Sequence, residues 1–295
     1  MLFVGIDAGG TKTDFALCDE NVNILKRVTL GAANPNDIGI DNTLRILKKG
    51  LELLCKDAVP DSIFAGVSGG GYGENKERIG EFLSALYPTS KIENGTDAIN
   101  LIYCSESKSN VGALICGTGT SLFVRVDSRI HRIGGWGHLF ERGGSAFDIG
   151  RDAISFMLFA EEEAMCGSQK MLQCPLVSML RQRLSGSAHD SLSMLYEKNK
   201  TYIASLAPTV FEAYESGDEQ AEKIIESNTD ALAKRLELAQ ARFGNIEEII
   251  CGGGLFNSEA FFEMLSKKAQ VKLNRISVDQ VVGACRRAIS AQCSH

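Results

Sequence analysis

Three glycine-rich turns, each placed directly after a short apolar run, constrain this chain more than any other feature of its sequence. The turns lie at residues 7–13, 117–121 and 252–254. Glycine lets backbone N–H groups converge on an anion, and the Thr and Ser hydroxyls in two of the turns add further donors. One such turn would mean little, but three at strand ends predict a nucleotide whose phosphates lie between two domains.

The first part of the chain alternates between predicted strands and helices. It opens with a meander of three strands joined by tight turns. Apolar residues at steps of four and three from Ile40 to Leu54 then predict an amphipathic helix. The strands expected here are 2–6, 15–18, 24–30, 62–67 and 91–93, and the helices are 40–54, 79–86 and 96–104.

The second part restarts with the same succession of strand, Gly/Thr turn and strand, at 111–126. We interpret this as a weak internal duplication, with chance recurrence of a glycine-rich hairpin as the alternative. A long helical stretch is expected next, at about 144–244. Its predicted breaks are 167–168, 186–187 and 217–218, and the later elements are a strand at 246–251, a helix at 258–269, an extended segment at 271–273 and a closing helix at 278–292.

Length and charge limit the class of protein. At roughly 150 residues per domain, 295 residues predict two domains, which we place at 1–108 and 109–295. Net charge is −6 and no long Lys/Arg run occurs, so the sequence lacks the basic footprint that nucleic-acid binding needs. No apolar stretch approaches the ~20 residues that cross a bilayer, so we expect no membrane span.

Cysteine usage indicates a reducing compartment. The nine cysteines include no CxxC pair, and Cys116 and Cys251 follow apolar runs that predict burial. The N-terminal residues read as a strand rather than a basic, apolar leader. We therefore expect reduced, buried thiols in a cytoplasmic protein.

Two common nucleotide-binding motifs do not occur. The sequence has no GxxxxGK[ST] loop, and no GxGxxG opens a helix after the first strand. Instead, residues 5–14 (GIDAGGTKTD), 115–120 (ICGTGT) and 250–254 (ICGGG) resemble the two phosphate motifs and the adenosine motif of the actin-like and hexokinase-type ATPase superfamily. Within that superfamily, nearly the whole chain resembles the BadF/BcrA-type ATPases, and most closely the N-acetylglucosamine kinases among them.

The resemblance implies a fold and a set of nucleotide contacts. The fold is α/β, with two ribonuclease-H-like domains, an interdomain cleft, a helical insertion in the second domain and a last helix that packs back on the first. ATP is the implied nucleotide, and Asp7 matches the acid that holds Mg²⁺, although an ordinary turn aspartate is the alternative. The implied ATP contacts are Gly9, Gly10, Thr11, Lys12, Thr13, Gly117, Thr118, Gly119, Thr120, Gly252, Gly253 and Gly254.

Asp97 matches the catalytic aspartate of the resembling kinases. Phosphoryl transfer to a sugar hydroxyl uses a carboxylate that accepts the proton and holds the hydroxyl in line with the γ-phosphate. Asp97 follows a predicted strand and Gly95, where a helix is expected to begin. An ordinary helix N-cap shared with Thr96 is therefore the alternative interpretation.

A second set of residues matches substrate contacts in those kinases. Each has a plainer reading: an Asn-Pro loop at Asn34, a core residue for the single tryptophan, and a structural imidazole for the histidine. The implied substrate residues are Asn34, Ser68, Gly69, Asp97, Gly135, Trp136, Gly137, His138 and Arg142.

Arg142 departs from the family pattern. The kinases typically have Gly-Asp-Glu-Gly-Ser where this chain has residues 141–145 (ERGGS), so a cation replaces the acid that contacts the sugar. Three interpretations stay open. Glu141 or Asp148 takes over the acidic role, the acceptor carries a negative group such as a lactyl carboxylate, or Arg142 turns to solvent.

The resemblance favours a kinase for the 6-hydroxyl of an amino sugar, such as N-acetylglucosamine, glucosamine or a muramic acid derivative, acting as a homodimer. One alternative is an ATPase that activates a 2-hydroxyacyl-CoA dehydratase or benzoyl-CoA reductase through an iron–sulfur cluster shared by two subunits. That function needs an exposed cysteine, for which Cys116, Cys166 and Cys251 are the candidates. The other alternative is a sugar sensor that has lost turnover.

Overall fold

The computed structural model describes residues 1–56, 58–107, 109–127 and 129–293. It divides the chain into two compact units, and each is described separately. The first unit comprises Met1–Ala113, Asp127–Ile130 and Ile276–His295, and the second comprises Leu114–Val126 and His131–Arg275. The domain boundary expected after residue 108 falls on a residue outside those described.

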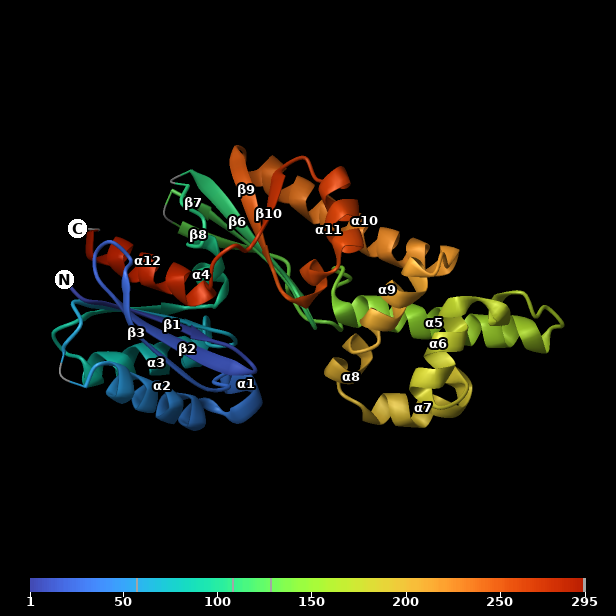
Figure 1. Cartoon of the computed structure of the whole chain (residues 1–295), viewed down its shortest axis with the longest axis horizontal. Helices are drawn as coiled ribbons and strands as arrows, with labels where there is room; N and C mark the ends of the chain where they lie inside the picture. Colours follow the sequence, from blue (N-terminus) through green and yellow to red (C-terminus); the bar gives the residue numbers. More distant parts are fainter. Residues whose placement is uncertain (57, 108, 128, 294–295) are drawn as a thin grey trace. The chain divides into compact units, whose positions relative to one another are not determined.

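The first unit contains a mixed sheet with the strand order β3-β2-β1-β4-β5 (Figure 1). β1 pairs antiparallel with β2 but parallel with β4, and β4 pairs parallel with β5. The carboxyl ends of β1, β4 and β5 therefore meet at one edge of the sheet. The strands are β1 (Phe3–Ala8), β2 (Lys12–Cys18), β3 (Ile24–Gly31), β4 (Ser62–Val67) and β5 (Lys91–Gly95).

Helices cover both faces of this sheet (Figure 1). α2 and α3 bury their apolar stripes against one face, and α12 packs on the other. The approach of α12 is close, because a Cβ at Gly5 of β1 would lie 2.4 Å from the backbone nitrogen of Cys285. The helices of this unit are α1 (Pro35–Ile38), α2 (Ile40–Leu54), α3 (Gly73–Leu86), α4 (Ala98–Ile102) and α12 (Gln280–Cys293).

A second five-stranded sheet has the order β10-β9-β6-β7-β8. β6 and β9, which lead into two of the glycine turns, are neighbours in it. The sequence did not predict β8, since its residues RIHRI are polar and partly exposed, as suits an edge strand. The strands are β6 (Asn110–Cys116), β7 (Thr120–Val126), β8 (Arg129–Ile133), β9 (Ile246–Gly252) and β10 (Lys272–Arg275).

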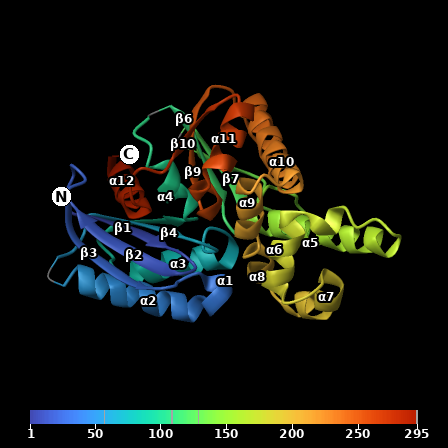
Figure 2. The same cartoon turned by 45° about the vertical axis from the view of Figure 1, so that its right-hand side comes forward.

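Helices of the second unit fill most of the stretch between β8 and β9, and α5 to α9 pack against one another (Figure 2). All three predicted breaks occur, and further interruptions follow α7 and α8. No helix in the described part of the chain is long and apolar enough to cross a membrane. The helices are α5 (Ala146–Met165), η1 (Met171–Gln173), α6 (Pro175–Leu184), α7 (Ala188–Glu197), α8 (Lys200–Ala204), α9 (Ala207–Glu215), α10 (Glu219–Phe243), η2 (Gly254–Asn257) and α11 (Glu259–Lys268).

Candidate active site

Two carboxylates lie where β1, β4 and β5 of the first unit end. Asp7 is on β1, and Asp97 follows β5. Between them, the loop after β4 begins with Ser68, whose N–H donates to the carbonyl of Ala8 (2.8 Å). The Ser68 side chain also hydrogen-bonds the carboxylate of Asp97. Three of the residues predicted for the site therefore meet at one sheet edge.

Asp97 is held by donors on its own loop. Its Oδ1 accepts from the Thr96 hydroxyl (2.9 Å) and from the N–H of Ala98 (3.1 Å), so it is also the N-cap of α4. Burial raises the pKa of Asp97, against the hydrogen bonds from its neighbours, which lower it. A carboxylate with a raised pKa is a better proton acceptor, so the capping role is compatible with a role as base.

Asp7 also has a raised pKa. Burial raises its pKa to about 6, even though the Nδ2 of Asn100 donates to its Oδ1 (2.7 Å). The negative charge of Asp97 raises the pKa of Asp7 further, so the two carboxylates interact electrostatically. A pair of this kind stabilises a cation bound beside it.

Asn100 is a site residue that sequence reasoning missed. It is fully buried on α4 and also donates to the carbonyl of Ile6 (3.3 Å). Gly66 makes room for it, because a Cβ there would lie 2.2 Å from the Asn100 Oδ1. The available signal was a lone amide within the otherwise apolar segment AINLI.

Asn34 and Gly69 pack against each other beside this edge. Asn34 caps α1 by accepting from the N–H of Asn36 (3.0 Å). Gly69 has φ +73°, and a Cβ on it would lie 2.3 Å from the Asn34 Oδ1. The same loop then reaches the β5 end, since a Cβ at Gly71 would lie 2.6 Å from the Thr96 nitrogen. The loop after β4 thus connects Asn34 with the segment that carries Asp97.

The first glycine turn is tight, and its tip is exposed. The N–H of Gly9 donates to the carbonyl of Lys12 (2.9 Å), while Gly10 and Thr11 face solvent. Lys12 pairs with Asp14 (2.6 Å). Thr13 is buried, and its hydroxyl donates to the carbonyl of Gly31 (2.8 Å), so its side chain serves the fold.

Two glycine turns adjoin each other in the second unit. The N–H of Gly117 donates to the carbonyl of Gly119 (2.9 Å), which closes the turn between β6 and β7. Gly253 follows β9 with φ +99°, and a Cβ there would lie 2.4 Å from the carbonyl oxygen of Cys116. Cys116 and Cys251 are buried, as predicted.

Gly253→Ala is expected to destabilise the chain by about 1–3 kcal/mol and to weaken ATP binding, because neither the backbone conformation nor the space beside Cys116 accepts a Cβ. Denaturant unfolding and calorimetric titration with ATP measure the two effects. Gly186→Ala is the matched control, since Gly186 has no left-handed backbone conformation and a Cβ there meets nothing within 4 Å. Equal stability of the two variants would contradict the packing argument.

The acceptor loop, as we name residues 134–143, carries the predicted substrate residues of the second unit. Trp136 is 63% exposed rather than part of a core. The guanidinium of Arg132 lies 4.7 Å from the centre of its indole ring. The His138 ring packs edge-on against Phe147, with 4.8 Å between ring centres. The loop therefore presents Trp136 at the surface, with its indole ring against Arg132.

The structure disfavours an acidic substitute for the aspartate that Arg142 replaces. Glu141 is ion-paired with Arg235 (2.5 Å), and Asp148 forms a capping box with Ser145 and pairs with Arg151 (3.0 Å). Arg142 is exposed, and within the described residues its side chain makes no hydrogen bond or ion pair. An anionic acceptor and a solvent-facing Arg142 are the two interpretations left.

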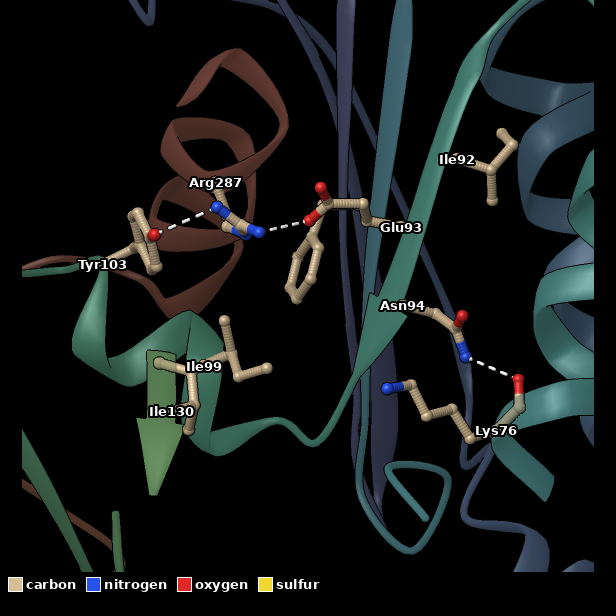
Figure 3. A pocket seen from close by; sticks show the side chains of 9 residues that line it. Lys76, Ile92, Glu93, Asn94, Ile99, Tyr103, Ile130 and Arg287 are labelled. Atoms are coloured by element: carbon tan, nitrogen blue, oxygen red, sulfur yellow. Dashed lines mark hydrogen bonds and ion pairs between the residues drawn. The ribbon is translucent and has the colours of Figure 1, made fainter. Parts of the chain in front are cut away.

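A pocket of about 500 Å³ runs along β5 in the first unit (Figure 3). Arg287 of α12 crosses it, binding Glu93 and donating to the Tyr103 hydroxyl (3.1 Å). None of the residues predicted for the site lines it. Its network instead ties α12 to β5 and to the end of α4, the two elements that flank Asp97.

The iron–sulfur alternative loses support from the cysteines. Cys116 and Cys251 are buried, and only Cys166 of the three candidates is exposed, at the end of α5. In the described ranges, no three His, Cys, Asp or Glu side chains gather as a metal site. A shared cluster would need exposed thiolates on a glycine turn, which neither Cys116 nor Cys251 provides.

The mixed sheets and the three glycine turns define an actin-like ATPase fold of the sugar-kinase type. Residues 4–285 match the BadF/BadG/BcrA/BcrD ATPase family, and the chain belongs to that family. The family and fold expected from the sequence are thereby confirmed.

Three proteins that are similar to this chain are named as kinases of N-acetylated amino sugars. An N-acetyl-D-glucosamine kinase from Dictyostelium discoideum is 26% identical over 99% of this chain and 98% of its own length. An N-acetylmuramic acid/N-acetylglucosamine kinase from Clostridium acetobutylicum is 29% identical over 75% of this chain and 74% of its own. A solved structure from Chromobacterium violaceum, provisionally named an N-acetylglucosamine kinase, superposes with a TM-score of 0.74 at 20% identity and covers 98% of both chains.

Proposed function

We propose that this chain is an ATP-dependent kinase that transfers the γ-phosphoryl group of ATP to the 6-hydroxyl of an amino sugar. The observation that carries the proposal is the meeting of Asp7, Asp97 and Ser68 at one sheet edge, with Asn34 and Gly69 beside them. The family is one of ATPases, and its similar members are named kinases of N-acetylated amino sugars.

Asp97 is the proposed base. Its raised pKa brings the carboxylate closer to the pH at which a base works best, and its bonds to Thr96 and Ala98 fix its direction. The carboxylate accepts the proton of the sugar hydroxyl as the oxygen attacks the γ-phosphorus, the bond to the bridging oxygen breaks, and ADP leaves. Asn34 and Gly69 are proposed to position other sugar hydroxyls.

ATP is proposed to bind through the glycine turns of both units. In the first unit, the exposed turn tip offers backbone N–H groups to phosphate. Asp7, whose carboxylate interacts with the negative charge of Asp97, fits a Mg²⁺ ion that would neutralise phosphate charge, because Mg²⁺ takes one or two carboxylates and otherwise binds water and phosphate oxygens. The proposed ATP contacts are Gly9, Gly10, Thr11 and Lys12 in the first unit, and Gly117, Thr118, Gly119, Thr120, Gly252, Gly253 and Gly254 in the second.

A panel assay tests the proposal. ADP release is followed with N-acetylglucosamine, glucosamine and N-acetylmuramic acid, and the product is examined by ³¹P–¹H NMR. Coupling of phosphorus to the C6 protons is the expected result. Phosphorylation at another oxygen would refute the 6-hydroxyl assignment alone, and absence of any phosphorylated sugar would refute the kinase.

Arg142→Asp is expected to shift preference by about tenfold from sugars with a carboxylate toward neutral ones, since it reverses the charge offered to the acceptor. The ratio of kcat/KM for N-acetylmuramic acid and N-acetylglucosamine measures this shift. Arg183→Asp, an exposed position on α6, is the matched control for the charge change. An unchanged ranking in the Arg142 variant would place its side chain outside the acceptor site.

A further inference from the structure

Arg235 of α10 is a largely buried cation that contacts the acceptor loop. Its side chain is only 12% exposed, and that of its partner Glu141 is 15% exposed. One guanidinium nitrogen, Nη2, lies 2.5 Å from the Glu141 Oε1 and donates to the carbonyl of Arg142 (3.4 Å). Arg235 therefore binds both a side chain and the backbone of the loop.

Glu141 extends this contact to the aromatic part of the loop. Its second oxygen, Oε2, accepts from the N–H of Trp136 (2.7 Å). The carbonyl of Gly137 accepts from the N–H groups of Phe140 and Glu141, which closes the loop on itself. A continuous chain of bonds thus runs from α10 through Glu141 to Trp136.

A second arginine holds the start of the loop. The Nε of Arg132 on β8 donates to the carbonyl of Gly134 (2.8 Å), and its Nη2 donates to the carbonyl of Gly135. Its guanidinium also lies over the Trp136 indole. Arg132 and Arg235 therefore anchor the loop from two different elements of the second unit.

Glycines leave the space that the ion pair occupies. Gly134 has φ +77°, and a Cβ there would lie 2.5 Å from the Glu141 Oε1. A Cβ at Gly143 would lie 2.9 Å from the Arg235 Nη1 and 3.4 Å from the Cβ of Thr120. The pair therefore fills room that any side chain at these glycines would take, and it adjoins the turn between β6 and β7.

Stability alone does not explain this pair. Removing two charges from water costs about as much as their attraction returns, and apolar replacements of similar volume are often as stable. The middle of the loop it holds carries Leu139 and Phe140, which are both exposed and form no core of their own. We therefore attribute to the Arg235–Glu141 pair the role of fixing the conformation of the exposed acceptor loop.

We propose that Arg235 is a positioning residue for the acceptor, and this inference rests on the proposed function. By holding Glu141 and the Arg142 carbonyl, Arg235 sets the conformation in which the loop presents Trp136 to the sugar. Its Nη1 is buried with no hydrogen-bond partner in the described residues, so the guanidinium keeps a spare donor beside Gly143.

Arg235→Met tests the proposal through two measurements. The KM for the acceptor sugar is expected to rise about 10- to 100-fold, because misplacing a positioning contact is costly, while the KM for ATP changes less than about twofold. Trp136 is the only tryptophan, so its fluorescence anisotropy reports the loop directly and is expected to fall. Arg235→Lys keeps the positive charge but not the planar set of guanidinium donors. It is expected to recover part of the acceptor KM and part of the Trp136 anisotropy.

Two further variants separate positioning from folding. Glu141→Leu with Arg235→Met removes both charges, so the melting temperature is expected to return toward that of the wild type while acceptor KM stays high. Lys234→Met, an exposed neighbour on α10, is the matched control and is expected to change neither readout. If Arg235→Met does not fold, the double variant supplies both measurements.

The outcomes distinguish this inference from the proposed function. Unchanged Trp136 anisotropy, or an ATP KM that rises as much as the acceptor KM, overturns the role of Arg235. If the wild type phosphorylates no amino sugar, the kinase proposal fails, and Trp136 anisotropy alone then decides whether Arg235 holds the loop.

Discussion

Asp97→Asn is expected to lower kcat for sugar phosphorylation by about 10³-fold, within the range that a lost general base costs. The folded chain is expected to be at least as stable as the wild type. Asparagine keeps an Oδ1 that accepts from the N–H of Ala98, and asparagine caps helices as well as aspartate does. It also removes a charge that burial disfavours, as the raised pKa of Asp97 indicates.

Coupled ADP release with the best sugar of the panel measures this effect, and thermal unfolding checks the fold. Glu52→Gln, which neutralises an exposed acid on α2, controls for the change in net charge. A variant that keeps more than one tenth of the wild-type kcat, with its melting temperature unchanged, would remove Asp97 from the role of base.

The sequence predicted the parts of the fold in which local pattern and tertiary packing agree. The central strands are continuous apolar runs, and α2 has a regular apolar stripe, so both were placed correctly. α3 begins at Gly73, six residues before the stripe that predicted it, because its first turns are polar and exposed. β8 was not predicted for the same reason: its residues are polar and partly exposed, so its sequence shows no alternation of apolar residues.

The candidate site was predictable where chemistry and turn geometry coincide in a short segment. Glycine turns after apolar strands are visible locally, and so is an acid at a strand end. The roles of Asn100 and Gly66 cannot be predicted locally, because they depend on a contact between α4 and β4. Arg235 is 93 residues from the carbonyl it binds and lies on a helix rich in charges, so nothing local separates it from an exposed lysine such as Lys234.

The charged forms of Asp7 and Asp97 reduce the stability of the folded chain, because burial disfavours both charges. Asp7 is partly buried and interacts with the charge of Asp97, and both carboxyl groups have raised pKa values. An acid whose pKa is raised in the folded state is less stable charged than it would be in the unfolded chain. Groups kept in such positions are typical of functional sites, where a ligand later supplies the compensating charge.

Asp7→Asn is expected to abolish sugar phosphorylation and, in metal-free buffer, to stabilise the chain at neutral pH. The unfolded pKa is near 3.8 and the folded pKa about 6, so the wild type loses stability as pH rises through this interval. The loss approaches about 3 kcal/mol above pH 7, at 1.36 kcal/mol per pKa unit. Asparagine keeps the Oδ1 that accepts from Asn100 but carries no charge, so the stability of the variant does not fall as the pH rises through this interval.

Denaturant unfolding in EDTA at pH 4.5 and pH 8 measures this difference. The variant is expected to exceed the wild type by up to about 3 kcal/mol at pH 8 and by only about 1 kcal/mol at pH 4.5, where Asp7 is mostly protonated in the folded state but already mostly charged in the unfolded chain. Adding Mg²⁺ with ATP should stabilise the wild type more than the variant, since a ligand that binds the folded state stabilises by mass action. Equal stability of the two proteins at pH 8 would contradict a buried, charged Asp7, and equal stabilisation by Mg²⁺ and ATP would contradict its role in holding the metal.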